Sequence, residues 1–279
     1  MTYLPYGKAA SGSWSVEITP SLAGWTYSGL RVAHLGGDPV SFSTGEEEML
    51  VLPLSGSCTV TCGASQFELT GRASVFAGPS DFAYIPISSD VTVEGSGRIA
   101  FPSARATRQL APRYVPASEV PVEIRGAGQA SRQVNNFCAP GVFECDKLVA
   151  VEVLTPGGNW SSYPPHKHDT LHEGEAVLEE IYYFEVADDG LGYQRVYSSE
   201  RGQIDTLAEV SSGDVVLVPY GYHGPSMAAP GYDLYYLNVL AGPADERSMA
   251  FCDDPRHAWI RSSWEGQDID PRLPFGRTS

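Results

Sequence analysis

The sequence has no apolar run that approaches ~20 residues, the length with which a helix crosses a membrane. Its first residues, MTYLPYGKAASGSW, lack the basic patch and apolar core of a secretion signal. Long runs of Ala, Leu, Glu and Lys are missing too, which argues against a helical bundle. We therefore expect a cytoplasmic protein that has no membrane partner.

Basic residues are scarce: 18 Lys and Arg stand against 34 Asp and Glu, for a formal net charge of −16. Such a surface repels phosphate backbones, so we expect no nucleic-acid partner. A small anionic metabolite is still compatible with this charge, because a few well-placed arginines can hold one carboxylate locally.

The chain has only five cysteines, an odd number without a repeating frame. Cys58 and Cys62 are four residues apart in CTVTC, and on a strand this spacing separates them by more than about 10 Å, which argues against a disulfide or a shared metal. We expect all five to be reduced thiols, most of them buried: Cys58, Cys62, Cys138, Cys145 and Cys252.

Glycine, proline and tyrosine, by contrast, are abundant, at 29, 21 and 15 residues. Short segments rich in β-branched and aromatic residues, such as EMLVLPL and EIYYFEV, fill residues 48–95 and 148–242 and end at Gly, Pro, Ser or Asp. This pattern predicts an all-β protein. In the tail, Asp254 and Pro255 suit the N-cap and the first position of a short C-terminal helix.

The two sets of predicted strands look alike. GEEEMLVLPLSGSCTV parallels VLEEIYYFEVADDGLGYQRVY, and GRASVFAGPSDFAYIP parallels SGDVVLVPYGYHGPSM. A period of roughly 130 residues is too long for a solenoid and predicts two homologous domains. The Pro-, Ser- and Gly-rich stretch 111–136 is typical of a linker, so we place the domains at 1–125 and 126–279.

Histidine is rare, with six residues, yet three lie in the short stretch PPHKHDTLH. His166 and His168 alternate on a predicted strand, which projects both imidazoles from one face about 7 Å apart, with Lys167 pointing the other way. Glu180 lies in the next predicted strand, and His223 follows a tight turn in PYGYHG. Three imidazoles and one carboxylate suit a zinc, iron, manganese, nickel or cobalt ion with one or two positions open.

Other residues compete for these roles. Glu173 is the main rival of Glu180, because it follows the histidine pair closely. We favour Glu180, since a rigid strand holds a ligand better than a loop does. His172 lies in the same loop and is expected to be solvated, whereas His34 and His257 have no partner in the sequence and are expected to be structural.

The order His-x-His, Glu, then Gly-x5-Pro-x-Gly-x-His resembles the two sequence motifs of the cupins, small antiparallel β-barrels that hold a metal at the mouth. YPPHKHD, LEEIYYFE, GQASRQVNN and DPRHAW resemble the 5-deoxy-glucuronate isomerases of myo-inositol catabolism, and more weakly the pectin-pathway deoxy-hexosulose-uronate ketol-isomerases. The resemblance runs across nearly the whole chain. It implies two tandem cupin-type antiparallel β-barrels (a bicupin), with these metal ligands in the second: His166, His168, Glu180 and His223.

The first half lacks the corresponding set. It offers only His34 where the repeat would place the histidine pair, and Asp81 where it would place His223. Glu48 matches Glu180 but stands alone. We therefore expect a first barrel without metal that supports the second or pairs subunits.

The resemblance implies an aldose–ketose isomerisation of 5-deoxy-D-glucuronate to 5-dehydro-2-deoxy-D-gluconate, with one divalent ion, zinc first among the candidates, as Lewis acid. A proton shuttle and a carboxylate anchor would complete such a site. Tyr182, on the face of Glu180, and Glu152, a carboxylate in an apolar strand, are the candidate bases. Arg132 and Arg247 are the candidate anchors for a uronate substrate.

Three questions stay open at this point. The pectin-pathway uronate is an alternative substrate, and the same fold also serves metal-dependent oxygenases. A cupin that binds a sugar acid without turnover, such as a sensor, is the alternative from another class. A homo-oligomer is compatible with the sequence but is not indicated by it.

Overall fold

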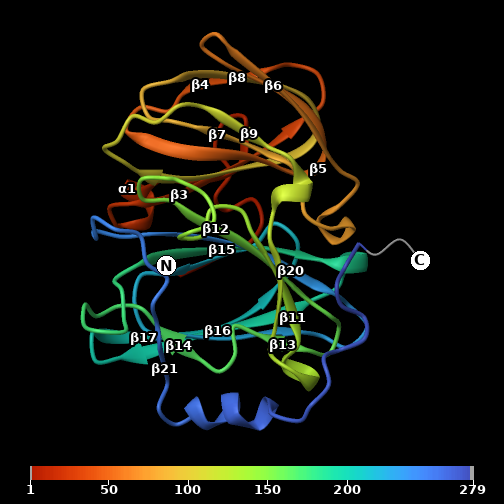
Figure 1. Cartoon of the computed structure of the whole chain (residues 1–279), viewed down its shortest axis with the longest axis vertical. Coiled ribbons are helices and arrows are strands. Elements are labelled where there is room, and N and C mark those ends of the chain that lie inside the picture. Colours follow the sequence, from red (N-terminus) through yellow and green to blue (C-terminus); the bar gives the residue numbers. More distant parts are fainter. Residues whose placement is uncertain (1, 277–279) are drawn as a thin grey trace.

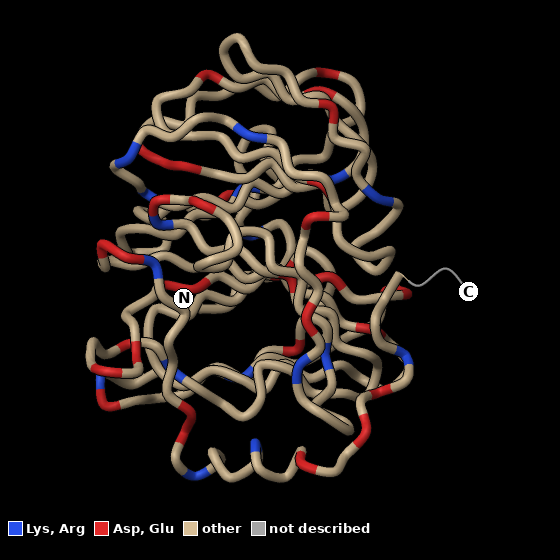
Figure 2. Tube along the Cα trace, viewed as in Figure 1, with Lys and Arg blue, Asp and Glu red and all other residues tan. Residues whose placement is uncertain are grey.

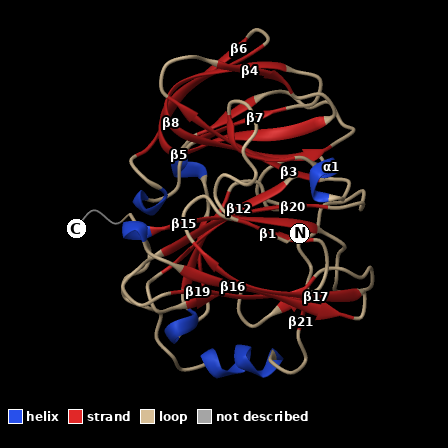
Figure 3. Ribbon diagram, turned by 180° about the vertical axis from the view of Figure 1, so that it is seen from behind, coloured by secondary structure: helices blue, strands red, loops and turns tan. Residues whose placement is uncertain are grey.

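The computed structural model describes residues 2–276, which form two β-rich halves stacked along the long axis of the molecule (Figure 1). Strands make up nearly all of the regular structure, and the helices are single turns or short 3-10 segments (Figure 3). The all-β prediction is therefore confirmed. No helix in the described residues is long and apolar enough to span a membrane.

The first half is built on one antiparallel sheet with the order β2-β3-β8-β5-β7-β9, to which β4 and β6 add at β8 and β5. The long strands β5 and β8 pair along most of their length. The bounds are β2 Trp14–Ile18, β3 Ser28–Leu35, β4 Val40–Ser43, β5 Glu47–Cys62, β6 Ser65–Arg72, β7 Phe82–Ile85, β8 Asp90–Arg105 and β9 Arg113–Val115, with helix α1 Pro20–Ala23 and the 3-10 helix η1 Val75–Ala77.

The second half has two facing sheets. The seven-stranded sheet has the order β1-β18-β15-β20-β12-β11-β10, and the six-stranded sheet joins β17-β16-β19-β14-β21, with β13 on β19. The bounds are β1 Tyr3–Leu4, β10 Val122–Arg125, β11 Arg132–Asn136, β12 Val149–Thr155, β13 Trp160–Ser161, β14 His166–Lys167, β15 Glu179–Val186, β16 Gly192–Ser199, β17 Gly202–Val210, β18 Val215–Val218, β19 Tyr222–Ala228, β20 Leu234–Ala241 and β21 Cys252–Asp253. The 3-10 helices are η2 Ala117–Glu119, η3 Gly128–Ala130, η4 Ala187–Asp189 and η5 Ala258–Trp264.

The chain crosses between the halves after β1 and again between β9 and β10. The N-terminal strand β1 pairs with β18, deep in the second half of the sequence. β9 still belongs to the sheet of the first half, whereas β10 pairs with β11 in the second. The division at 125/126 stays a prediction. Both ends of the segment 1–125, namely β1 and β10, pair with strands of the second half.

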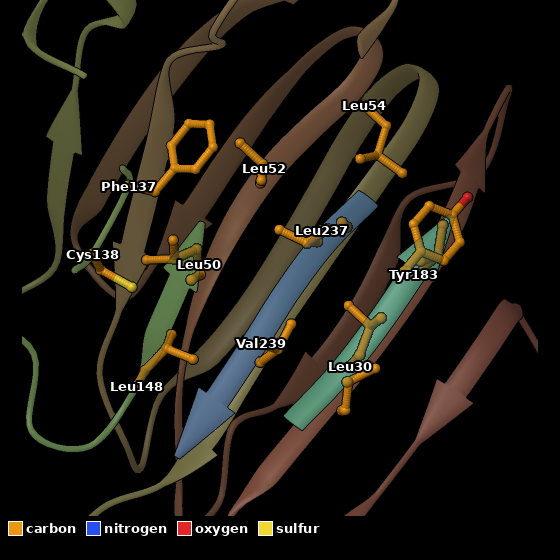
Figure 4. Close-up of a cluster of buried hydrophobic side chains, with 14 of the residues drawn as sticks. Leu30, Leu50, Leu52, Leu54, Phe137, Cys138, Leu148, Tyr183, Leu237 and Val239 are labelled. Atoms are coloured by element: carbon orange, nitrogen blue, oxygen red, sulfur yellow. The ribbon is translucent and has the colours of Figure 1, made fainter. Parts of the chain in front are cut away.

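An apolar layer joins the two halves. It combines Leu30, Leu50 and Leu52 of the first sheet with Tyr183, Leu237 and other side chains of the second half, as Figure 4 shows. These side chains come from alternate positions of their strands, as expected for a sheet that is buried on both faces. The remaining positions of β15 and β20 face the interior of the second half, where the candidate site lies.

The structure corrects the internal repeat at Glu48 and at Asp81. Asp81 corresponds to Asp214 rather than to His223, because β7 pairs with β5 as β18 pairs with β15. The Glu48 carboxylate accepts hydrogen bonds from the backbone amides of residues 146–148 and from Tyr84, away from the interior of the first barrel. Glu179 makes the same kind of contact in the second half, with the amides of residues 26–28. Glu48 therefore corresponds to Glu179, and Met49, in an apolar interior, occupies the place of Glu180.

The short C-terminal helix is confirmed, but it begins later than predicted. The 3-10 helix η5 runs from Ala258 to Trp264, and Asp254 is not its N-cap. The Asp254 carboxylate is instead occupied by Arg256 and by the hydroxyl of Tyr197. All five cysteines are free thiols, and only Cys252 is partly exposed, in agreement with the prediction.

Candidate metal centre

A cavity of about 470 Å³ opens inside the second half, between the seven-stranded sheet and the C-terminal segment. Strands β11, β12, β15 and β20 contribute one wall, and residues from Met249 to Trp264 contribute another. His166, His168 and Glu180 line its polar end. The predicted ligands therefore border a space that is large enough for a small metabolite.

The four predicted ligands converge from three strands. His168 Nε2 lies 2.9 Å and His223 Nε2 lies 3.0 Å from the same Glu180 oxygen, Oε2. His166 pairs with His223 across β14 and β19, and their ring centroids are 4.4 Å apart. We call these four residues the His–Glu centre; the ligand atoms of His168, Glu180 and His223 all lie within 4.8 Å of one another.

Backbone carbonyls orient all three imidazoles. The Nδ1 atoms lie 3.1 Å from Pro164 O in His166, 3.0 Å from Leu178 O in His168 and 3.3 Å from Gly221 O in His223. A carbonyl can only accept, so each Nδ1 carries the ring proton and each Nε2 offers a lone pair.

His223 supplies the test of whether a cation fits. Its side chain is fully buried, and its Nε2 atom has no hydrogen-bond partner. A buried nitrogen lone pair that faces a carboxylate oxygen is unfavourable unless a proton or a cation lies between them. The donor set of imidazoles and one carboxylate suits a divalent transition metal. The residues therefore fit a metal ion.

The pKa values in the centre follow from mutual contacts. Although burial opposes its charge, neighbouring His223 and His168 hold the pKa of Glu180 well below its usual range. Burial and the nearby His223 push the pKa of His166 well below its ordinary value. Glu180 raises the pKa of His168 in spite of burial. The carboxylate is thus ionised and His166 neutral, the forms that bind metals.

The geometry also distinguishes the rival residues of the loop. Glu173 is exposed and does not border the cavity, so Glu180 is the carboxylate that meets the imidazoles. The side chain of His172 is 48% exposed and does not border the cavity. His34 is likewise exposed, in the first half.

Tyr182 lies where the strand pattern predicted it, on the cavity face of β15 beside Glu180. Its hydroxyl is 2.8 Å from the hydroxyl of Ser162, another cavity residue. Burial and the Glu180 charge raise the pKa of Tyr182 well above its ordinary value. Asn238, its partner on β20, is 95% buried and borders the same cavity, and its Nδ2 has no hydrogen-bond partner.

The two predicted arginine anchors lie in different places. Arg132 borders the cavity, is 7% exposed and donates only to the carbonyl of Ala130. Burial and the neighbouring guanidinium groups of Arg125 and Arg261 lower its pKa to about 10. Arg247 lies outside the cavity and donates to the carbonyls of residues 138, 143 and 148, so the structure gives it a structural role instead.

Glu152 also needs correction, because it does not border the cavity. It faces the first half, where its carboxylate pairs with the buried Arg72 and accepts from Asn135 and Tyr235. As expected, the Glu152 carboxylate in its apolar strand has a partner, but this partner is Arg72 of the first half. The structure therefore removes Glu152 from the candidate bases.

Sequence reasoning missed several polar cavity residues, among them Arg125, Arg261 and Asn238. Arg125 and Arg261 have their own carboxylate partners, Glu123 and Asp253. Arg125 and Arg261 reach the cavity because β10 and the C-terminal segment fold back over the barrel. No local sequence pattern predicts that folding. Asn238 places an amide inside the run LYYLNVL, which is otherwise aliphatic and aromatic, and that signal could have identified it.

Comparison with known proteins agrees with this geometry. Residues 3–260 match the model of the KduI/IolB family. The 5-deoxy-glucuronate isomerase of Geobacillus kaustophilus (strain HTA426) is 42% identical over 256 residues, which cover 89% of this chain and 91% of the relative. That of Bacillus subtilis (strain 168) is 39% identical over 253 residues, which cover 88% and 91%.

Solved structures support the fold. An IolB-like protein from Salmonella typhimurium LT2 superposes with a TM-score of 0.86 at 35% identity, over 93% of this chain and 99% of that one. Lactobacillus farciminis oxalate decarboxylase, at 11% identity and a TM-score of 0.64, covers 89% of this chain and 88% of its own, and shares the fold alone. The predicted bicupin fold and the resemblance to isomerases are thereby confirmed, and the chain belongs to the KduI/IolB family.

Proposed function

We propose that this protein is a metal-dependent aldose–ketose isomerase that converts 5-deoxy-D-glucuronate to 5-dehydro-2-deoxy-D-gluconate in the cytoplasm, within myo-inositol catabolism. The name of the relatives supports the reaction class. The cavity supports it independently, because it combines a candidate metal centre with a cation at a second wall.

The observation that carries the proposal is Arg132. Its guanidinium is buried in the cavity and has no carboxylate partner among residues 2–276, while Arg125 and Arg261 beside it are both paired. An uncompensated buried cation favours an anion, and a guanidinium binds a carboxylate through two parallel hydrogen bonds. A uronate would satisfy Arg132 with its carboxylate and present its carbonyl end to the His–Glu centre.

The ligand atoms of His168, Glu180 and His223 fit one divalent ion. His166, beside His223, would complete the set, with zinc as the first candidate and manganese, iron, nickel and cobalt as alternatives. Such an ion supplies a Lewis acid that polarises a carbonyl and the hydroxyl next to it.

The chain's own side chains then orient the substrate and handle protons. The Tyr182 hydroxyl is a candidate to give and take the proton that moves between adjacent carbons, and it lies 2.8 Å from the hydroxyl of Ser162. The free Nδ2 of Asn238 can donate to a substrate oxygen near Tyr182. Apolar side chains of Val151, Leu240 and Phe251 limit the water in the cavity.

The decisive experiment incubates the purified protein with 5-deoxy-glucuronate and, separately, with the pectin-pathway uronate, with and without a chelator, and follows both by proton NMR. We expect product from the first uronate, its loss on chelation and its return with zinc. Conversion of the second uronate alone would move the protein to the pectin branch of the family. Tight binding without product or exchange of C–H protons would indicate a sugar-acid-binding protein.

Two variants test the residues. His168→Ala should lose the bound ion and turnover together, and Tyr182→Phe should keep the ion but lose turnover by roughly 10²- to 10⁴-fold, the usual contribution of a positioned acid or base.

Full activity with a redox-inert ion would exclude an oxygenase. The oligomeric state stays open, and size-exclusion chromatography with light scattering measures it directly.

A further inference from the structure

A second cluster of metal-ligating side chains lies outside the cavity. It consists of His172, Glu175 and Cys252, whose ligand atoms all lie within 4.8 Å of one another. Cys252 in β21 is the strand partner of Lys167 in β14, and the other two come from the loop between β14 and β15. We propose that these three side chains, here called the His–Cys site, bind a second divalent cation of the zinc class.

The distances suit a tetrahedral ion. His172 Nε2 lies 3.0 Å from Glu175 Oε2 and 3.8 Å from Cys252 Sγ. Zinc binds nitrogen and oxygen at about 2.0–2.2 Å and thiolate at about 2.3 Å, so tetrahedral ligands lie about 3.3 Å apart for N and O and about 3.6 Å apart for N and S. Both observed separations are within about 0.3 Å of those values, so an ion fits with little movement.

The imidazole of His172 is oriented in the same way as those of the His–Glu centre. Its Nδ1 lies 2.8 Å from the backbone carbonyl of Glu173, which can only accept a hydrogen bond. The ring proton therefore sits on Nδ1, and Nε2 directs a lone pair at Glu175 Oε2. Two lone pairs 3.0 Å apart repel unless a proton or a cation lies between them.

Glu175 is held so that one oxygen is presented to the site. Its Oε1 accepts from Lys167 Nζ at 2.9 Å and from the amides of Asp169 at 2.8 Å and Thr170 at 3.0 Å. Such outer contacts fix ligating carboxylates in metal sites. Lys167 Nζ also lies 3.0 Å from Oε2, but it shares its charge with Asp169 Oδ1 at 3.0 Å.

The charges of the His–Cys site balance with an ion in place. A Cys252 thiolate, Glu175 and Asp169 supply three negative charges, and Lys167 with a divalent cation supplies three positive ones. The half-exposed ring of His172 leaves room for a water molecule as fourth ligand. An ion there would fasten the loop that follows His168 to β21, on the face of β14 opposite the cavity.

Metal content tests the proposal directly. Protein equilibrated with zinc and freed of excess metal should carry two ions per chain in the wild type, one in Cys252→Ser and one in His172→Ala. His34→Ala, which removes an exposed histidine of the first half, is the control and should retain two. A single ion in the wild type, or two in Cys252→Ser, would overturn the His–Cys site.

Cobalt distinguishes the two sites, because the His–Glu centre contains no cysteine. Thiolate-to-cobalt charge-transfer absorption should appear in the wild type and in His168→Ala, and disappear in Cys252→Ser. Absorption that persists without Cys252 would assign the thiolate to another residue and refute the proposal. The readout is independent of turnover, so its failure leaves the proposed isomerase function untouched.

Discussion

Three buried side chains of the candidate site have a polar atom or a charge that no other described residue satisfies. His223 and Asn238 are buried polar groups with unused hydrogen-bonding atoms, and Arg132 is a buried cation without a counter-ion. The sequence predicted His223 and Arg132, because spacing and resemblance mark them. It also suggested Glu152 and Arg247 wrongly. The apolar strand around Glu152 reveals that this carboxylate has a partner but not on which side of the sheet the partner lies, and nothing in the sequence shows that Arg247 contacts backbone carbonyls.

Arg132→Met should weaken substrate binding rather than the chemical step. Loss of a charge-assisted contact is worth about 1.5–3 kcal/mol, so KM should rise on the order of 10- to 100-fold with a smaller change in kcat. Arg247→Met is the matched control: it removes contacts to three carbonyls outside the cavity lining and should lower the melting temperature but leave KM unchanged. An unaltered KM in Arg132→Met would contradict the anchor.

Asn238→Leu tests the unpartnered amide. If Nδ2 donates to the substrate, kcat/KM should fall by roughly 10- to 100-fold, while stability should hold or rise because an unsatisfied polar group is removed. Gln194→Leu is a close control, since Gln194 is also buried with a free Nε2 but does not border the cavity. Steady-state kinetics and thermal melts on both variants test whether Asn238 contacts the substrate. Equal losses of kcat/KM in the two variants would reject this role.

Among the elements, the alternating faces of strands were the most predictable feature. Tyr182 faces the cavity and Tyr183 faces the first half, as a period of two requires. The repeat was misaligned by a single residue at Glu48, because a glutamate pair fits either register and only three-dimensional contacts select one. The start of η5 was missed for a similar reason: Asp254 suits a cap, but Arg256 and Tyr197 occupy its carboxylate.

The strand segment after His223 depends on Gly224, which lies within β19. Its φ is +92°, and a Cβ there would lie 1.8 Å from the carbonyl oxygen of Ser162. Gly231 has nearly the same φ, +93°, but open space around it, so Gly231→Ala should cost only the strain of about 1–3 kcal/mol. Gly224→Ala should lower the free energy of unfolding by clearly more than Gly231→Ala does. It should also release the metal, because β19, which contains His223, must shift. Urea unfolding compares the two; equal losses would mean that the close approach is unimportant.

Apolar packing and ion pairs hold the two halves of the molecule together. The sequence repeat predicted two halves but not their contact, since residues such as Leu50 and Leu237 show only that a face is buried. Figure 2 shows acidic residues along both halves, in keeping with the net charge of −16. Arg72 and Arg98 nevertheless reach across to Glu152 and Glu185, so opposite charges are concentrated at the interface.

Arg72→Met should destabilise both halves together. It leaves Glu152 buried without its cation, a change worth about 3–5 kcal/mol. Glu152→Gln should cost a comparable amount, because it leaves Arg72 buried without its anion and offers one acceptor oxygen to the two donors Tyr235 and Asn135. Arg105→Met is the control, since its ion pair with Glu46 is exposed and worth about 0–1 kcal/mol.

Calorimetry should show a single transition that moves to lower temperature in Arg72→Met. Below that transition kcat/KM should match the wild type, because neither partner of this ion pair borders the cavity. Were Glu152→Gln to abolish turnover in a protein that melts like the wild type, Glu152 would act in the reaction after all. The buried pair would then connect the first half to catalysis rather than to stability alone.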